Sequence, residues 1–123
     1  MAPTVLVLED ESGLREVLGL MLEYSGYDVE AVRNGAEGLR RLREGLRPAC
    51  VLLDLMMPIM DGPEFVRAMR ADATLASIPV VVLSGITRML DDPSSLGAAA
   101  YLEKPLDVPR VPDVVAEQCG PAR

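Results

Sequence analysis

Five side chains suited to polar chemistry each stand at or just beyond the end of a short apolar run: Glu9, Asp10, Asp54, Ser84 and Lys104. A carboxylate at the end of a buried strand costs free energy unless a metal ion or hydrogen bonds compensate it. Carboxylates prefer a hard cation such as Mg²⁺, while a hydroxyl and an ammonium group can hold the oxygens of an anion. Such a set suits phosphoryl transfer to a carboxylate, with an acceptor, a bridging metal and donors for the phosphoryl oxygens.

The stretch Val51–Gly62 makes Asp54 the first candidate for that acceptor. A continuous apolar run ends in Asp54, and the loop that follows contains Pro58 and Asp61-Gly62, which favour turns. Pro63 is suited to the first turn of a helix. Ligands of open α/β sheets bind at the carboxyl edge of the strands, which is where Asp54 is expected to lie.

Lys104 is the only lysine among twelve basic residues, and the sequence contains no histidine. Where every other cation is Arg, a single Lys near a strand end indicates a site that uses a compact ammonium group. The lack of histidine excludes His-based triads, phosphorylation on histidine and most zinc sites. Each of the five side chains alone has a plain explanation, such as a solvated acidic turn, but their joint occurrence at strand ends favours one shared site.

The elements that must position these side chains alternate along the chain. Apolar runs predict five strands, the second of them a half-exposed edge strand: Thr4–Leu8, Tyr27–Val32, Ala49–Leu53, Val80–Leu83 and Tyr101–Leu102. Amphipathic spacing predicts helices over about 12–25, 36–46 and 63–72, with Ser12 as the cap of the first, and a short last helix over 111–119. The pattern predicts a three-layer α/β fold with a parallel sheet, whose carboxyl edge gathers the five side chains.

Length and composition limit the class of protein. A chain of 123 residues fits a single domain over 1–123, with a core of about 4–119. The net charge of −7 argues against a nucleic-acid surface, and no apolar stretch is long enough to span a membrane. We expect no signal peptide, since only a very short apolar run precedes Glu9. The distant Cys50 and Cys119 fit reduced thiols, with Cys50 acting as a small hydrophobic residue. We expect a soluble cytoplasmic domain.

Over nearly its whole length the chain resembles the CheY-like receiver domain of bacterial two-component response regulators. The residues that carry the match are Glu9-Asp10, Asp54 in the stretch that ends in Asp61-Gly62, Ser84 in Val82-Leu83-Ser84-Gly85, and Lys104-Pro105. The resemblance implies a flavodoxin-like sheet of five parallel strands in the order 2-1-3-4-5. It also implies phosphorelay signalling: a partner histidine kinase or phosphotransfer protein phosphorylates Asp54, which switches binding to a downstream protein.

The same resemblance implies a metal site. Asp10, Asp54 and the backbone carbonyl of Met56 would hold Mg²⁺, or Mn²⁺ in its place, and Glu9 would contribute through water. The chain would then catalyse only its own phosphorylation and dephosphorylation, so we do not expect an enzyme that acts on other substrates.

The remaining site residues are assigned by resemblance as well. Lys104 and Ser84 would bind the phosphoryl oxygens. Tyr101 matches the aromatic residue whose rotation, coupled to the hydroxyl of Ser84, reports phosphorylation to the output face. The Lys104–Pro105 peptide is expected to be cis.

Several positions depart from the usual family pattern. Met56 and Ile86 place apolar side chains at two positions that tune hydrolysis of the acyl phosphate in this family, so we expect a phosphorylated state that is not short-lived. A fourth helix, expected over 87–96, is weakened by Pro93, and the last helix, which is then the fifth, is weakened by Pro109 and Pro112. This region forms the family's usual signalling and dimerisation face. We therefore expect a monomer or a weak dimer.

Two alternative functions stay open. A receiver-fold interaction module could work without phosphorylation, although such a module is expected to lose acidic, hydroxyl or lysine positions that this chain keeps. A metal-dependent aspartyl phosphatase fits poorly, because Met56 stands where the haloacid-dehalogenase type needs a second Asp. After Lys104 there is room for little more than one helix, so no output domain is expected in this chain. Met1 and the short tail lean toward a self-contained protein over a domain of a longer regulator or hybrid kinase.

Overall fold

The computed structural model describes residues 2–55, 57, 59–84, 97–105 and 107–120. Within them, five strands form one parallel sheet: β1 (Thr4–Leu8), β2 (Asp28–Val32), β3 (Cys50–Leu53), β4 (Val80–Ser84) and β5 (Ala100–Glu103). The strand order is β2-β1-β3-β4-β5, so the predicted order and the parallel sheet are confirmed. Strand β2, predicted as an edge strand, lies at one edge and is only partly buried.

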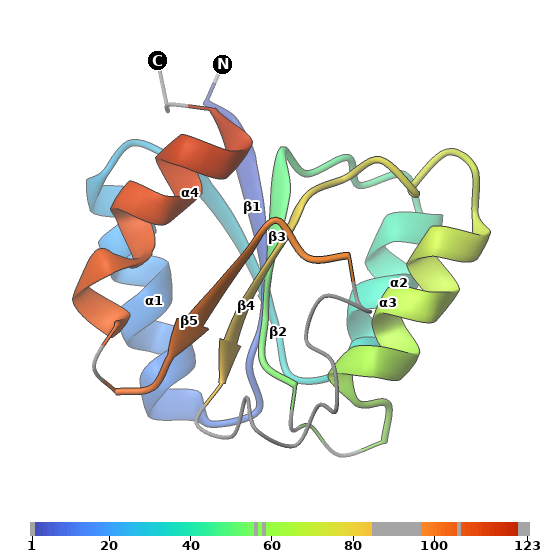
Figure 1. The fold of residues 1–123 in the computed structure, drawn as a ribbon, viewed down its shortest axis with the longest axis horizontal. Helices are drawn as coiled ribbons and strands as arrows, with labels where there is room; N and C mark the ends of the chain where they lie inside the picture. Colours follow the sequence, from blue (N-terminus) through green and yellow to red (C-terminus); the bar gives the residue numbers. More distant parts are fainter. Residues whose placement is uncertain (1, 56, 58, 85–96, 106, 121–123) are drawn as a thin grey trace.

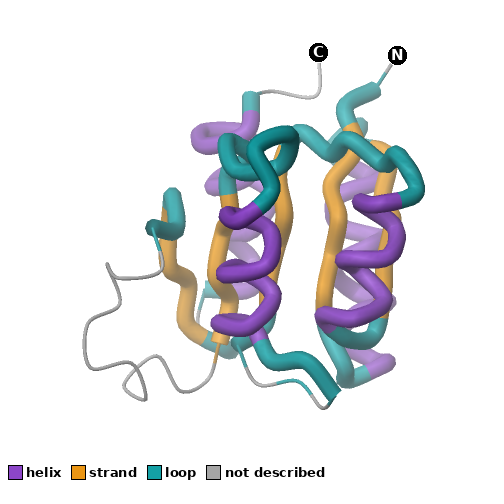
Figure 2. The backbone as a smooth tube through the Cα atoms, turned by 90° about the vertical axis from the view of Figure 1, so that its right-hand side faces the viewer, coloured by secondary structure: helices purple, strands orange, loops and turns teal. Residues whose placement is uncertain are grey.

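The α-helices of the described residues cover both faces of this sheet (Figure 1). On one face lie α1 (Ser12–Tyr24) and α4 (Val111–Cys119), and on the other lie α2 (Gly35–Arg43) and α3 (Gly62–Ala71). Figure 2 views the molecule from the side of α2 and α3, with the sheet behind them. The three-layer α/β fold predicted from the alternating pattern is confirmed.

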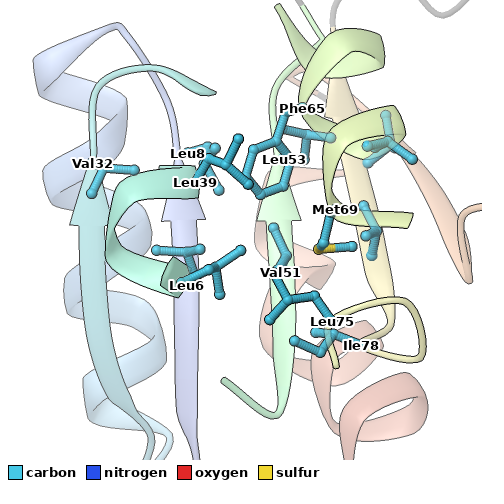
Figure 3. Close-up of a cluster of buried hydrophobic side chains, with 14 of the residues drawn as sticks. Leu6, Leu8, Val32, Leu39, Val51, Leu53, Phe65, Met69, Leu75 and Ile78 are labelled. Carbon is cyan, nitrogen blue, oxygen red and sulfur yellow. The ribbon is translucent and has the colours of Figure 1, made fainter. Parts of the chain in front are cut away.

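Two hydrophobic cores hold the layers together, one on each face of the sheet. Alternate residues of β1 serve them: Leu6 and Leu8 pack toward α2 and α3, and Val5 and Val7 pack toward α1 and α4. Burial on both faces explains why β1, β3 and β4 are continuous apolar runs. The core beneath α2 and α3 closes around the fully buried Phe65 (Figure 3). This packing fixes the directions of the strands whose ends carry the polar side chains.

Side-chain caps set the starts of α2 and α3, but not the start of α1. The Asn34 side chain accepts a hydrogen bond from the Glu37 N–H, and Asp61 and Glu64 form a reciprocal capping box. At α1 the cap position is held by Glu11, which makes no side-chain cap hydrogen bond. The prediction that Ser12 caps this helix is therefore wrong, and the turn before α1 must be fixed in another way.

The C-terminal part of the described chain agrees with the sequence pattern. Helix α4 spans the predicted residues and follows a 3-10 helix over Val108–Arg110. Pro109 and Pro112 are accommodated because each lies in the first turn of its helix, where a backbone N–H has no partner inside the helix. The Lys104–Pro105 peptide is cis, as expected. The predicted weak helix over 87–96 lies outside the described residues.

Two further predictions concern the chemical setting of the chain. Cys50 is fully buried at the start of β3 and is disulfide-bonded, so the expectation of a reduced thiol at this position is wrong. Among the helices of the described residues, none combines the length and the apolarity that crossing a membrane requires.

Candidate functional site

The backbone ladder continues one residue beyond β1 and β3 and so places two of the acidic residues. The N–H of Glu9 donates to the carbonyl of Val32 at 3.1 Å, and the N–H of Asp54 donates to the carbonyl of Leu8 at 3.0 Å. Because β1 pairs with β3 in parallel, the residues that follow these strands emerge side by side at the carboxyl edge.

Three carboxylates converge there, as the sequence predicted for neighbouring first and third strands. One oxygen from each of Glu9, Asp10 and Asp54 lies within 4.8 Å of the others. Glu9 is only 1% exposed and Asp54 only 5%, whereas Asp10 faces solvent. Such a cluster is self-repelling in the absence of a cation, and its all-oxygen donors fit a hard divalent ion such as Mg²⁺.

Lys104 follows the edge strand β5 and reaches the same cluster from that edge of the sheet. Its N–H donates to the carbonyl of Ser84 at 3.1 Å, which extends the pairing of β5 with β4. The ammonium Nζ then lies 2.7 Å from Oε1 of Glu9 and 3.1 Å from Oδ2 of Asp54. One lysine therefore bridges the two buried carboxylates.

Burial and ion pairing act in opposite directions on the pKa values of Glu9 and Lys104. Burial, reinforced by the negative charge of Asp54, raises the pKa of Glu9 to about 7, although the hydrogen bond from Lys104 works in the opposite direction. Burial alone would lower the pKa of Lys104, but the carboxylates of Glu9 and Asp54 outweigh it and the net pKa is raised. The lysine is thus a firmly held cation, and the Glu9 carboxyl is a weaker acid than an ordinary glutamate.

Ser84 and Tyr101 belong to neighbouring strands and share one face of the sheet. Ser84 is the fully buried last residue of β4. Two residues earlier, Val82 packs in the core on the side of α2 and α3, and alternation puts Ser84 on that same side. Tyr101 pairs in register with Val82 and packs against the same core. The arrangement is compatible with the coupling expected between them.

The loop between β3 and α3 is described in part. Met56, whose carbonyl is expected to bind the metal, lies outside the described residues, as do Pro58 and Ile86. Ile59 is 81% exposed and has a φ of 72°, a conformation that β-branched residues rarely adopt. The carbonyl of Met60 accepts a hydrogen bond from the N–H of Gly35 at 3.1 Å, so the start of α2 supports this loop.

Two contacts at the site were not predicted from the sequence. One is the short ion pair between Glu9 and Lys104; Glu9 had been assigned to the metal and Lys104 to the phosphoryl group. The other involves Arg15, whose guanidinium donates to the backbone carbonyls of Glu9 and Asp10. The only signal for the second was the position of Arg15 one helical turn after the acidic residues, and that signal is weak.

The fold and the edge site together define a doubly wound α/β domain with three carboxylates and one lysine at the carboxyl ends of its strands. The chain belongs to the family of response regulator receiver domains, whose sequence profile matches residues 5–116. It is a CheY-like domain of the two-component signalling class.

Known relatives agree with this assignment. The chain is similar to the DNA-binding response regulator MtrA of Mycobacterium tuberculosis, with 38% identity over 107 residues that cover 85% of this chain and 45% of that protein. It is also similar to the DNA-binding dual master transcriptional regulator RpaA of Synechocystis, with 34% identity over 108 residues that cover 86% of this chain and 44% of that protein. The chain therefore spans somewhat less than half the length of these relatives.

A solved structure extends the comparison to the site. The receiver domain of the sensor histidine kinase PA1611 from Pseudomonas aeruginosa superimposes with a TM-score of 0.87 at 25% identity, over 98% of this chain and 99% of that one. That structure contains a magnesium ion coordinated in its active-site cleft.

Proposed function

We propose that residues 1–123 form a single receiver domain, with a core of about 4–119, that is switched by Mg²⁺-dependent phosphorylation of Asp54. The observation that carries this proposal is the setting of the Asp54 carboxylate. It is almost fully buried at the carboxyl edge, 3.1 Å from the ammonium of Lys104 and beside two further carboxylates. A buried acid with both a cation partner and a metal-type donor set is suited to accept a phosphoryl group.

The transfer follows from these positions. An oxygen of the ionised Asp54 carboxylate attacks the phosphorus of a phosphohistidine on the donor protein. A P–O bond forms, the P–N bond breaks, and the imidazole nitrogen keeps the electron pair. Lys104 and Ser84 are proposed to hold the phosphoryl oxygens, with Lys104 leaving one of its two carboxylate partners to do so. Bound Mg²⁺ supplies the positive charge that lets two anionic groups approach each other.

The residues proposed to hold the metal are Asp10, Asp54 and the backbone carbonyl of Met56, with Glu9 acting through water. The described members of this set fit a hard cation because all their donors are oxygens and lie close together. Mn²⁺ is expected to substitute. The magnesium ion in the PA1611 receiver domain supports this choice by analogy.

The proposed partners are a histidine kinase or histidine phosphotransfer protein as the donor and a protein target downstream. The family assignment supports the donor class. We propose no nucleic-acid binding by this chain itself, because its net charge is −7, although MtrA and RpaA are DNA-binding regulators. We further propose that the protein is cytoplasmic and forms a monomer or a weak dimer. Ser84 and Tyr101 are proposed to act as the switch, and the acyl phosphate is not short-lived.

Acetyl phosphate tests the acceptor chemistry without a kinase. The purified protein is incubated with acetyl phosphate and Mg²⁺, and its intact mass is measured for a single phosphoryl adduct. Wild type is expected to form the adduct in the presence of Mg²⁺ and to form none when EDTA replaces the metal. Asp54→Asn is expected to form none. Glu64→Gln, on the exposed start of α3, is the control carboxylate and should react as wild type. An adduct that persists in Asp54→Asn would refute the assignment.

A further inference from the structure

The turn that joins β1 to α1 carries two of the three carboxylates and is closed by few contacts. Its cap residue, Glu11, makes no side-chain hydrogen bond to the helix start. The N–H of Glu11 instead donates to the Glu9 carboxylate at 3.2 Å. This bond ties the Asp10–Glu11 peptide to the Glu9 side chain, but the carbonyl oxygens of Glu9 and Asp10 need a different partner.

Arg15 supplies that restraint from the next turn of α1. Its Nη1 donates to the carbonyl of Glu9 at 2.9 Å and to the carbonyl of Asp10 at 3.3 Å. Its own N–H donates to the carbonyl of Glu11 at 2.9 Å. One residue therefore binds three successive carbonyls of the acidic turn, two with its side chain and one with its backbone.

These bonds bear on the direction of the carboxylates. The orientation of each carbonyl fixes the backbone torsion beside it, and that torsion in turn limits where the following side chain points. Three neighbouring carboxylates also repel one another and tend to open the turn. The guanidinium counters that tendency, and its hydrogen bonds within the described part of the chain go to backbone oxygens, so both carboxylates stay available for other partners.

We propose that Arg15 is a positioning residue for the metal site, which sets the acidic turn so that Glu9 and Asp10 meet Asp54 at the sheet edge. This inference rests on the proposed function, because it assigns Arg15 a part in holding the Mg²⁺ that the phosphorylation requires. Arg15 itself contacts neither the metal nor the phosphoryl group.

Charge and positioning predict opposite results when Arg15 is replaced. If Arg15 acted only through its positive charge, Arg15→Met would relieve repulsion of the cation and raise the affinity for Mg²⁺. If Arg15 positions the turn, Arg15→Met lowers that affinity. Arg15→Lys keeps the charge but cannot reproduce the planar guanidinium, so under the positioning role it recovers only part of the loss.

Arg47, in the loop between α2 and β3, offers a matched control. Its Nη1 also donates to two backbone carbonyls, those of Leu42 and Leu46, each at 2.9 Å. Arg47→Met therefore removes the same number of bonds of the same kind, away from the acidic turn. A merely structural role for Arg15 predicts that the two Met variants behave alike at the metal site.

The experiment measures the Mg²⁺ dissociation constant by calorimetry and, in the metal-free proteins, the NMR order parameters of the amides of Asp10 and Glu11. Substitution of groups that orient metal ligands typically weakens metal binding by about tenfold or more. We expect the affinity for Mg²⁺ to fall about tenfold in Arg15→Met, to fall less in Arg15→Lys and to stay unchanged in Arg47→Met. We also expect lower order parameters of the turn in Arg15→Met alone.

Unchanged or tighter Mg²⁺ binding in Arg15→Met, or equal losses in Arg15→Met and Arg47→Met, would overturn the inference. The wild type separates this result from a failure of the proposed function. If wild type binds no Mg²⁺, the proposed function fails, and the order parameters of the metal-free turn then decide the role of Arg15 alone. Unchanged order parameters in Arg15→Met would reject that role.

Discussion

The ammonium of Lys104 lies closer to Glu9, at 2.7 Å, than to the proposed acceptor Asp54, at 3.1 Å. The site is therefore organised as a lysine shared between two buried acids. Its charge balance depends on Glu9 as much as on Asp54, since the two carboxylates and Lys104 are coupled through short contacts. An arriving phosphoryl group competes with both carboxylates for this one cation.

Replacement of Lys104 is expected to destabilise the metal-free protein. Removal of one partner from a buried ion pair leaves charge without compensation, so Lys104→Met should lower the free energy of unfolding by about 2 kcal/mol, a value reduced because the lysine is partly exposed. Urea denaturation in EDTA measures the change. The double variant Glu9→Gln/Lys104→Met should regain part of the loss, because it also removes one of the two carboxylates that the single variant leaves without the lysine. Strictly additive effects of the two substitutions would contradict the coupling.

The raised pKa of Glu9 predicts a pH dependence of stability in the metal-free protein. Between its ordinary pKa of 4.5 and about 7, the folded protein binds more protons at Glu9 than the unfolded chain does. The contribution of Glu9 to the free energy of unfolding is therefore fully present below about pH 4.5 and is lost as pH rises through about 7. This contribution has an upper limit of about 3 kcal/mol. No histidine titrates in this window, because the sequence contains none.

Urea denaturation in EDTA at about pH 5 and about pH 7.5 checks this dependence. Glu9→Gln has no group to titrate and should show a much flatter profile. Equal slopes for wild type and Glu9→Gln would show that the dependence arises elsewhere.

Two helical glycines are expected to respond in opposite ways to a methyl group. A Cβ at Gly38 of α2 would lie 2.7 Å from Cδ2 of Leu8 and 3.3 Å from Phe65, both buried, so Gly38→Ala should destabilise by about 2 kcal/mol. A Cβ at Gly19 of α1 meets nothing nearer than 3.9 Å, and Gly19→Ala should stabilise by about 0.5–1 kcal/mol. Thermal and urea unfolding of both variants test the close approach of α2 to β1. A Gly38→Ala protein as stable as wild type would reject it.

The backbone of Ile59 predicts a gain of stability on substitution. A positive φ is costly for a β-branched side chain and far easier for Asn, and the side chain of Ile59 is largely exposed, so little packing is lost. Ile59→Asn should raise the free energy of unfolding by about 1 kcal/mol. Ile59→Val keeps the β-branch and should leave stability nearly unchanged. A loss of stability in Ile59→Asn would mean that the exposed side chain makes contacts worth more than the strain.

The alternation of apolar runs and amphipathic segments was sufficient to predict a parallel sheet with helices on both faces. The strand order, which makes the first and third strands neighbours and brings the acidic residues together, came from the resemblance to receiver domains. The ends of buried strands are visible in the sequence, because a charged or polar residue interrupts each apolar run. Asp54 and Ser84 were identified in this way. The sequence also indicated the last helix despite Pro109 and Pro112, since prolines are tolerated in a first helical turn.

The contacts within the site were harder to predict. The reach of Lys104 to Glu9 depends on the relative height of strand ends that are not adjacent in the sheet, which only the register of β1, β3, β4 and β5 defines. The bonds from Arg15 to backbone carbonyls leave no trace in a pattern of side-chain types. The cap of α1 was misassigned for a related reason. Ser12 is a residue type that caps helices well, but here it is the first residue of the helix, and Glu11 holds the cap position.

The most direct test of the central claim is to locate the phosphoryl group on the protein after treatment with acetyl phosphate and Mg²⁺. Peptide mapping by mass spectrometry is expected to place a single phosphoryl group on Asp54, with none on Glu9 or Asp10 and none anywhere when EDTA replaces the metal. A phosphoryl group on another residue, or no phosphoryl group under conditions that modify a known receiver domain in parallel, would contradict the account.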